Sequence, residues 1–249
     1  MYNEKATTLF KNWDEALIWS CLQGYMGTLI SDDDNNPSSA IITNGDFSFC
    51  AGIPNEKLLK SVPIRSFMLI TSNHEDWYPL IELVFAEKAK KILRYAIKKQ
   101  PEIFNKGKLE LFVNSLDDEY ELRMFDSEVY KLAEKESWSV DLCSQFKNYE
   151  DYHNRAIGTA ILHNGNLVSG ASPYAVYKDG IEIEIDTKPE YRGKGLATVC
   201  GAKLILECIA KNIYPSWDAH DLRSVHLAEK LGYHFSHPYV TYEIVDGTK

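Results

Sequence analysis

The clearest pattern of hydrophobic and polar positions lies in the second half of the chain. Apolar β-type residues fill three runs, at residues 158–163, 167–176 and 181–186, and the third run alternates isoleucine with acidic residues. The dipeptides Asn164-Gly165 and Asp179-Gly180 separate these runs. Because Asn-Gly and Asp-Gly favour two-residue hairpin turns, the pattern predicts three antiparallel strands joined as a meander.

Helical spacing replaces this alternation further along the chain. Apolar residues recur every three or four positions over residues 196–209, which predicts a helix with one buried face. A second helix is expected over residues 222–231, with Asp221 as its N-cap and Gly232 at its C-terminal end. Residues 235–244 are rich in β-type side chains and predict a closing strand.

The first half of the chain combines both kinds of pattern. Residues 13–22 and the longer stretch 80–99 have helical spacing, and the longer stretch carries many lysines opposite its apolar face. Asn44-Gly45 is a further hairpin signal. Runs of β-type residues predict strands at 40–43, 47–50 and 66–71.

A polar stretch at residues 114–119 is the expected domain boundary. It precedes a strand-like run at 120–125 and a helical pattern at 127–136. We therefore predict an α+β chain, with an N-terminal α/β domain of unknown role at residues 1–116 and a second domain at residues 117–249.

The charge of the chain is distributed unevenly. The net charge is −9, and residues 117–249 carry 14 Lys and Arg against 22 Asp and Glu, whereas residues 1–116 carry 13 against 14. This acidity argues against a nucleic-acid partner, because phosphates need neutralisation by basic side chains. It favours cationic substrates such as amines, although a well-solvated surface explains the same charge equally well.

The cysteines and histidines give no sign of a metal centre. No C-x-x-C pair is present, the cysteines are odd in number, and we expect all of them to be small buried residues. They are Cys21, Cys50, Cys143, Cys200 and Cys208. His220 and His226 are close in sequence, but no third ligand has matching spacing, so no metal is expected.

The chain also lacks the patterns of export and membrane insertion. Residues 1–27 carry Glu4, Asp14 and Glu15, and no basic segment followed by an apolar one. No run approaches the roughly 18 consecutive apolar residues of a membrane span. We therefore expect a cytoplasmic protein that does not bind membranes.

The candidate chemistry is concentrated in residues 184–197, where the third strand runs through a glycine-rich loop into a helix. Gly193 and Gly195 let the backbone turn, so that several N–H groups point at one spot. The helix N-terminus, Arg192 and Lys194 add positive charge. The arrangement suits a pyrophosphate, although a tight strand–helix connection explains the glycines as well. The spacing fits neither the Rossmann nor the P-loop motif.

This loop resembles the acetyl-CoA signature of the GNAT superfamily of N-acetyltransferases. The signature, Arg/Gln-x-x-Gly-x-Gly/Ala, matches Arg192, Gly195 and Ala197, after the lead-in Pro189-Glu190-Tyr191. Residues 224–233 look like the late helix of the same superfamily, which ends in Leu-Gly-Phe/Tyr.

The resemblance covers residues 120–244 and implies a GNAT fold, a mixed and mostly antiparallel sheet flanked by helices. Residues 217–219 (Trp-Asp-Ala) and the long N-terminal extension resemble a bacterial two-domain branch that includes zwittermicin A resistance-type acetyltransferases.

The resemblance further implies that acetyl-CoA is the cosubstrate and that no metal is needed. Backbone groups of Ile185 and Thr187 would bind the pantetheine arm as an added strand does. An asparagine that the family places near the pantetheine falls at Asp221, where N-capping alone explains the residue. Backbone amides would hold the pyrophosphate at Arg192, Gly193, Lys194, Gly195, Leu196 and Ala197.

The acid–base residues are less specific. Glu182 and Glu184 lie two residues apart on the predicted strand and so share one face, which is also the pattern of solvent-facing acids on a half-buried sheet. Glu184 is the first candidate base because it is nearer the loop. The family's acid tyrosine is replaced by Ala228. Candidates to replace that tyrosine are Ser224, Tyr233, His226 and water.

We therefore predict transfer of an acetyl group from acetyl-CoA to a primary amine of a small molecule, by direct attack and without a covalent enzyme intermediate. Two alternatives stay open. One is an acyl-CoA-binding regulatory or sensor module without turnover, which Ala228 favours, and the other is an interaction scaffold. Either a monomer or a homodimer fits the sequence.

Overall fold

The computed structural model describes residues 4–63 and 65–245, which form two compact units. Unit 1 contains the described residues up to Arg94 and those from Pro238 onward, and unit 2 contains Tyr95–His237. This division differs from the expected one between residues 116 and 117. The chain returns to unit 1 through the second part of β12 (Phe235–Val245), and such a long-range return leaves no local signal in the sequence.

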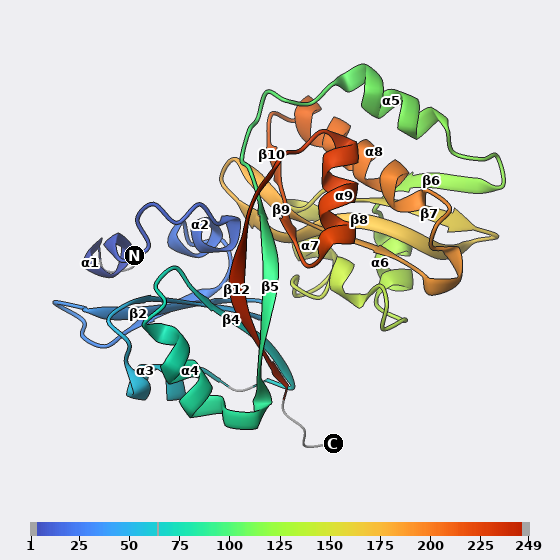
Figure 1. Cartoon of the computed structure of the whole chain (residues 1–249). Helices are drawn as coiled ribbons and strands as arrows, with labels where there is room; N and C mark the ends of the chain where they lie inside the picture. The colour runs from blue at the N-terminus through green and yellow to red at the C-terminus, as the bar shows by residue number, and fades with distance from the viewer. Residues whose placement is uncertain (1–3, 64, 246–249) are drawn as a thin grey trace. The chain divides into compact units, whose positions relative to one another are not determined.

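Unit 2 is built on a five-stranded sheet in the order β10-β9-β8-β7-β6 (Figure 1). Its strands are β6 (Tyr120–Met124), β7 (Thr159–His163), β8 (Asn166–Tyr177), β9 (Gly180–Thr187) and β10 (Tyr214–Ser216). All neighbours are antiparallel except β9 and β10, which are parallel. The predicted meander is confirmed, and Asn164 and Gly165 both have the positive φ that a tight hairpin turn requires.

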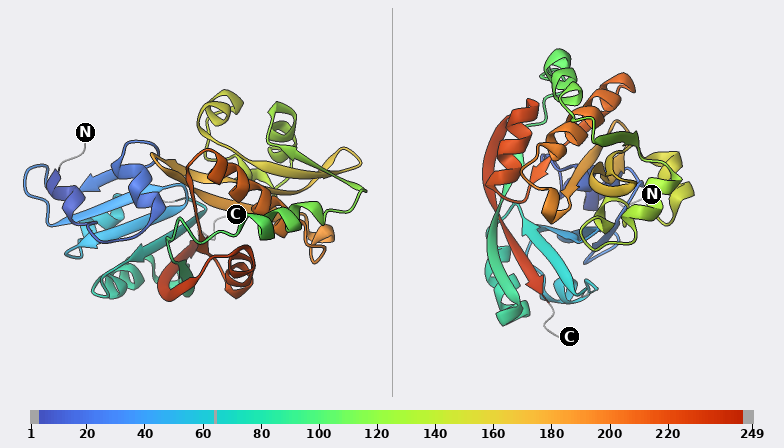
Figure 2. Two further views of the ribbon diagram at one scale, coloured as in Figure 1. Left: turned by 90° about the horizontal axis from the view of Figure 1, so that it is seen from above. Right: turned by 90° about the vertical axis from the view of Figure 1, so that its right-hand side faces the viewer.

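One face of this sheet is covered by α8 (Leu196–Ala210). Thr159 Oγ1 in β7 donates to the backbone oxygen of Cys200 in α8 at 2.9 Å. A Cβ on Gly201 would lie 3.1 Å from Ile185 Cδ1, so the Ile185 side chain points at this helix. Outside it, α5 (Lys106–Asn114) packs along α8 (Figure 2).

The opposite face carries α6 (Ser127–Ala133), α7 (Tyr149–Arg155) and the 3-10 turn η2 (Val140–Leu142). Leu142 fills the space above Gly170, where a Cβ would lie 2.6 Å from its methyl carbon. The Tyr152 hydroxyl is 2.7 Å from Ser172 Oγ in β8. Side chains of β9 that do not point at α8 therefore lie under η2 and α7.

The helix α9 (Leu222–Leu231) has the ends that the sequence predicts. Asp221 Oδ1 accepts from the Ser224 N–H at 3.0 Å, which makes Asp221 the N-cap. Gly232 ends the helix with a φ of 113°. Before this helix, β11 (Asp218–Ala219) pairs antiparallel with the end of β5 (Ala89–Ile97).

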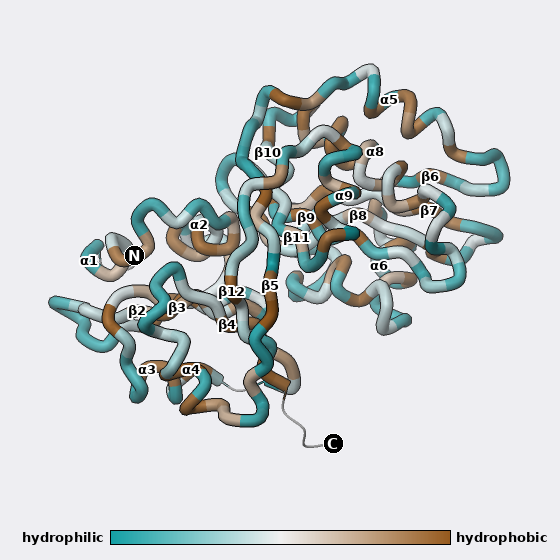
Figure 3. Tube along the Cα trace, viewed as in Figure 1, coloured by the Kyte–Doolittle hydropathy of each residue, from teal (hydrophilic) through white to brown (hydrophobic). Residues whose placement is uncertain are grey.

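Unit 1 has the antiparallel strands β1 (Thr28–Ser31), β2 (Ser39–Asn44) and β3 (Phe47–Gly52), then β4 (Phe67–Ser72) parallel to β3. The C-terminal part of β12 pairs antiparallel with β4. Helices α1 (Glu4–Thr8), α2 (Ala16–Leu22), α3 (Glu56–Lys60) and α4 (Trp77–Phe85) complete it. Its core includes the fully buried Trp77, Ile81 and Tyr242, and hydrophobic segments run through α2 and α4 (Figure 3).

The predicted helix over residues 80–99 is wrong. The helix α4 ends at Phe85, a short turn follows, and residues from Ala89 to Ile97 form strand β5. The residues of β5 suit a helix or a strand about equally well, because few of them are β-branched. Pairing with β11, which lies far along the chain, is a long-range contact that local spacing does not reveal.

Candidate functional site

The edge of β9 that faces away from β8 is open over its second half. β8 accompanies β9 along its whole length, whereas β10 pairs only with Gly180, Ile181 and Glu182. Among the described residues, positions 183–187 of β9 therefore have a strand partner on one side only. An open strand edge presents unpaired N–H and C=O groups, which an extended ligand can bind.

The backbone groups on this edge belong to Ile185 and Thr187. The Lys188 N–H donates to Val168 O of β8 at 2.9 Å, and alternate residues of a strand point their backbone groups to the same side. The groups of Asp186 and Glu184 therefore face β8, and those of Ile185 and Thr187 face the open edge. These are the two positions to which the family resemblance assigns the binding of a pantetheine arm.

The loop that follows β9 leads into the N-terminus of α8. Gly193 has a φ of 77° and Gly195, the N-cap, has a φ of 82°, which favours glycine at both positions. A Cβ on either glycine would meet no atom within 4 Å, so the loop borders open space. In the described part of the chain no acceptor is recorded for the N–H groups of Gly193, Gly195 or Ala197. Free amides at the start of a 15-residue helix are able to bind an anion.

The two basic side chains of the loop are held beside it. Arg192 Nε donates to the Thr187 carbonyl at 3.2 Å, on the open edge of β9. Lys194 Nζ donates to the Tyr120 hydroxyl at 3.2 Å and lies 4.9 Å from the centre of the Tyr191 ring. The hydrogen bond to Tyr120 raises the pKa of Lys194. Both side chains are exposed and can turn towards an anion in the loop.

A cluster of aromatic residues supports the loop from β6 and β7. His163 Nδ1 is 2.9 Å from the Tyr191 hydroxyl, and the rings of Tyr120 and His163 are 5.3 Å apart. Glu119 lies 3.6 Å from His163 Nε2. These contacts join residues far apart in sequence, so no local pattern marks Tyr120 or His163 as part of the site.

The acidic residues of β9 have different surroundings. Glu182 is 4% exposed, and its carboxylate lies 4.0 Å from Lys99 Nζ. Glu184 is half-buried and stands opposite Ser172, on the face that carries α7. Of the two, Glu184 is therefore the more exposed.

Asp186 is a third acid on this face, which the sequence pattern did not single out. It stands opposite Gly170, below the turn that carries Asp141 and Leu142. Burial, together with the Asp141 carboxylate, raises the pKa of Asp186 to about 6, and Arg192 acts weakly in the other direction. A carboxyl group with such a pKa exchanges its proton near neutral pH.

Ser224 is held by the indole of Trp217, whose Nε1 donates to Ser224 Oγ at 3.0 Å. Because the hydroxyl accepts this bond, its own hydrogen remains able to donate. Trp217 is in turn fixed by Lys99, whose Nζ donates to the Trp217 carbonyl at 3.3 Å. Lys99 thus connects the Glu182 carboxylate with the segment that carries Ser224.

The other residues considered for an acid have less suitable positions. The Tyr233 hydroxyl donates to the Pro215 carbonyl at 2.7 Å, and burial raises the pKa of this phenol well above its usual value. Ala228 is fully buried in α9, and His226 is exposed on the same helix.

Asp221 is occupied by its capping bond and by Arg223, which donates to Asp221 Oδ2 at 2.6 and 2.8 Å. Burial by itself would raise the pKa of Asp221, but these hydrogen bonds outweigh it, and the pKa of Asp221 is lowered. The capping role predicted for this residue is confirmed.

Residues 4–63 and 65–245 are the described part of the chain. They contain no group of three or more His, Cys, Asp or Glu side chains placed to hold a metal ion. No helix in this part of the chain combines the length and apolar composition needed to cross a membrane. All five cysteines are buried.

Comparison with known proteins extends the similarity to both units. The chain is 42% identical to a GCN5-related N-acetyltransferase-like protein from Streptococcus suis 89/1591, with a TM-score of 0.91 and 95% of each chain covered. It is 26% identical to the uncharacterized N-acetyltransferase YdfB of Bacillus subtilis strain 168, over 97% of this chain and 95% of the relative. A GCN5-related N-acetyltransferase from Kribbella flavida shares the fold at 12% identity, with a TM-score of 0.58 and coverage of 97% and 96%.

The family comparison covers far more of the chain than the two motifs did. The model of the GNAT acetyltransferase family matches residues 7–242, whereas the motif-based resemblance began at residue 120. The match thus includes most of unit 1 as well as the glycine loop of unit 2. This chain belongs to the GNAT acetyltransferase family.

Proposed function

We propose that the protein transfers an acetyl group from acetyl-CoA to a primary amine of a small molecule. The observation that carries the proposal is the continuity of two features. The open edge of β9 at Ile185 and Thr187 leads directly into the glycine loop and the N-terminus of α8. An extended arm that ends in a diphosphate, as in coenzyme A, matches both features at once.

Binding would use backbone groups along this path. Thr187 and Ile185 would bond the pantetheine amides as a neighbouring strand does, and Arg192 would release the Thr187 carbonyl to make this possible. The N–H groups from Gly193 to Ala197 would hold the diphosphate. The Ile185 N–H would donate to the thioester oxygen, where negative charge develops during attack.

The reaction requires a neutral amine, because an ammonium group has no lone pair. Glu184 would accept the proton of the ammonium, directly or through one water molecule. The amine nitrogen then attacks the acetyl carbonyl carbon, the C–S bond breaks, and the proton that the nitrogen loses as the amide forms passes through the Ser224 hydroxyl to the thiolate. The Ser224 hydroxyl, polarised by Trp217, would donate in this last step, and Glu182 would act through Lys99 rather than on the substrate.

The acceptor is proposed to be a small cationic amine. Glu182, Glu184 and Asp186 line one face of β9, and this negative charge attracts and orients a positively charged substrate. Asp221, by contrast, serves as a helix cap in this proposal and has no direct bond to the coenzyme.

The test is the release of free thiol from acetyl-CoA in the presence of a panel of small amines, measured with the full chain. Gly195→Glu places a carboxylate in the loop and should remove thiol release. Gly24→Glu is the matched control, because Gly24 also has a positive φ (79°) and no atom within 4 Å of a Cβ position, but lies in unit 1.

The outcomes separate the proposal from its alternatives. Amine-dependent release in the parent protein and in Gly24→Glu, with none in Gly195→Glu, supports acetyl transfer. Coenzyme binding without release for any amine favours a sensor module. Equal release by Gly195→Glu and the parent would remove the loop from the mechanism.

A further inference from the structure

The two units repeat the same order of elements. In unit 2 the chain runs through α6, α7, the meander β7-β8-β9, then α8, β10 parallel to β9, α9 and β12. In unit 1 it runs through α1, α2, the meander β1-β2-β3, then α3, β4 parallel to β3, α4 and β5. In each meander a tight turn leads into the last strand, which is β3 in unit 1 and β9 in unit 2. A helix then connects this last strand to a parallel neighbour. Nine elements thus correspond in the same order, with β11 and short 3-10 turns as the only additions between them, which indicates a duplicated fold.

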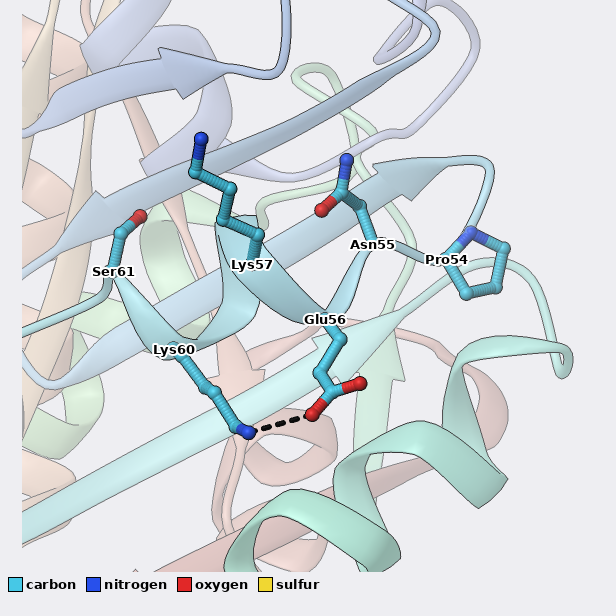
Figure 4. Close-up of a pocket in the computed structure, with 6 residues that line it drawn as sticks. All are labelled: Pro54, Asn55, Glu56, Lys57, Lys60 and Ser61. Carbon is cyan, nitrogen blue, oxygen red and sulfur yellow. Dashed lines mark hydrogen bonds and ion pairs between the residues drawn. The ribbon is translucent and has the colours of Figure 1, made fainter.

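The duplicated fold places a second strand-to-helix corner in unit 1, between β3 and α3. In unit 2 eight residues connect β9 to the 15-residue α8, whereas in unit 1 only residues 53–55 connect β3 to the five-residue α3. The Asn55 side chain accepts from the Leu58 N–H at 3.0 Å and so occupies an amide at this helix end. Glu56 pairs with Lys60 on the same turn (Figure 4).

The unit 1 corner has no room for an extended ligand. A Cβ on Gly52 would lie 2.1 Å from the Ser38 carbonyl, and the Ile53 N–H donates to that same carbonyl at 2.9 Å. The Ile53 N–H is therefore already occupied by a hydrogen bond within unit 1. The depression lined by Pro54, Asn55, Glu56, Lys57, Lys60 and Ser61 lies on the outside of this short turn (Figure 4). Unlike Gly193 and Gly195, Gly52 borders packed backbone.

The last strand of each repeat serves the other unit. After α9, strand β12 pairs with β4 in unit 1, with Phe67 opposite Val245 and Thr71 opposite Thr241. After α4, strand β5 pairs in unit 2 with β11, where Ala96 stands opposite Asp218. Each unit is thus completed by a strand that follows the final helix of the other repeat.

This exchange gives the first repeat a role in the site of the second. The residues that follow β5 include Lys99, whose amine contacts both the Trp217 carbonyl and the Glu182 carboxylate. The Lys99 side chain is 11% exposed, so this contact is made inside unit 2. The pairing of Tyr95 with Ala219 likewise holds β11, which lies between Trp217 and Ser224.

We infer that the chain is an internally duplicated acetyltransferase whose two repeats have exchanged their last strands. Only the second repeat keeps an open coenzyme corner, and the first supplies a strand and the positioning residue Lys99 to it. The count of one coenzyme per chain rests on the proposed function, whereas the strand exchange does not.

The exchange is tested with cysteine pairs in the full chain. Phe67→Cys with Val245→Cys joins two exposed positions that face each other across β4 and β12. Ala96→Cys with Asp218→Cys joins two half-buried positions that face each other across β5 and β11. A protease site in the connection at residues 115–118 then separates the two halves of the sequence. After oxidation and cleavage, each pair should hold the fragments together on a non-reducing gel.

A control pair, Thr28→Cys with Val245→Cys, uses exposed positions on β1 and β12, which are separated by β2, β3 and β4 within unit 1. Fragments linked by both test pairs and not by the control support the exchange. Fragments that separate with either test pair, while the uncut variant keeps its cooperative melting, overturn it.

The coenzyme count is measured by titrating the full chain with coenzyme A in a calorimeter. The expected result is one molecule per chain, and none in Gly195→Glu. Two molecules per chain, or one that remains in Gly195→Glu, would show a second open corner and overturn this part. A parent protein that binds no coenzyme contradicts the proposed function, and the cross-links then still decide the exchange.

Discussion

The corner between β9 and α8 and the corner between β3 and α3 occupy the same place in two repeats of one fold. In unit 2 a long loop with two left-handed glycines leaves backbone amides open at the start of a long helix. In unit 1 the Ile53 N–H of the short connection donates to the Ser38 carbonyl, and Asn55 caps a helix of little more than one turn. The two corners have the same topology, so topology alone does not make a binding site. The length of the loop, its glycines and its unoccupied amides make the difference.

The largest expected effect concerns catalysis at the open corner. Glu184→Gln keeps the size of the side chain and removes its ability to accept a proton. We expect kcat to fall about 1,000-fold, within the range of general base catalysis, while coenzyme affinity stays unchanged. Steady-state kinetics and calorimetry measure the two quantities.

The matched control for this change is Glu190→Gln, an exposed acid in the loop itself. Its kcat should stay close to that of the parent. If Glu184→Gln retained more than a third of the parental kcat, the base would have to be sought at another residue, with Asp186 the next to test.

The second prediction concerns Lys99, the residue that the first repeat contributes to unit 2. Lys99→Ala removes the ammonium group that lies 4.0 Å from the buried Glu182 carboxylate, and it removes the bond to the Trp217 carbonyl. The free energy of unfolding should fall by about 3 kcal/mol, as for other broken buried ion pairs. Denaturant unfolding measures this loss.

Lys98→Ala is the control, since Lys98 is the neighbouring exposed lysine, and it should change stability by less than about 0.5 kcal/mol. In the double variant Lys99→Ala with Glu182→Gln, much of the lost stability should return. If Lys99→Ala were as stable as Lys98→Ala, the positioning role proposed for Lys99 would be contradicted.

The third prediction concerns the electrostatic cost of the open corner. The pKa of folded Asp186 is about 6, above that of an unfolded aspartate, so the folded protein holds this proton where the unfolded chain has lost it. The stability that the group contributes is present below about pH 4 and is lost as the pH rises to 6. Asp186→Asn should therefore raise the free energy of unfolding by about 2 kcal/mol at pH 7 and leave it unchanged at pH 4.

Denaturant unfolding at a series of pH values tests this sign. Asp179→Asn, in an exposed turn, is the control and should reproduce the parental curve. A stabilisation by Asp186→Asn that is the same at pH 4 and pH 7 would rule out the titration as its cause.

The smallest expected effect lies at the closed corner. Asn55→Ala removes the cap of α3 and should lower the free energy of unfolding by about 1 kcal/mol. Because this corner takes no coenzyme, affinity for coenzyme A should not change. Asn55→Ser, which retains a capping oxygen, should recover most of the stability, and any change in coenzyme affinity with Asn55→Ala would argue for a ligand at this corner.

Local chemistry in the sequence predicts the parts of the fold that short segments determine. Asn164-Gly165 fixes a hairpin, Asp221 and Gly232 fix the ends of α9, and the glycine pair marks the loop. The helix expected over residues 80–99 fails because β5 is stabilised by partners far along the chain. The boundary expected between residues 116 and 117 differs from the division into units, because residues 95–116 belong to unit 2 and β12 returns to unit 1.

The candidate site divides along the same line. Ile185, Thr187 and the loop residues are contiguous, so a motif can locate them. Lys99, His163 and Tyr120 reach the site only through the fold, and the ranking of Glu184 over Glu182 needs their burial. The sequence did not point to Asp186 for another reason. The raised pKa of this residue depends on its burial and on the nearby Asp141 carboxylate.

Hydrogen–deuterium exchange with and without coenzyme A tests the central claim most directly, because it reports on backbone amides one peptide at a time. Peptides that cover residues 183–198 should exchange more slowly with coenzyme A, and peptides that cover residues 50–60 should not change. Unaltered exchange at residues 183–198 in the presence of bound coenzyme, or equal protection at both corners, would contradict the account.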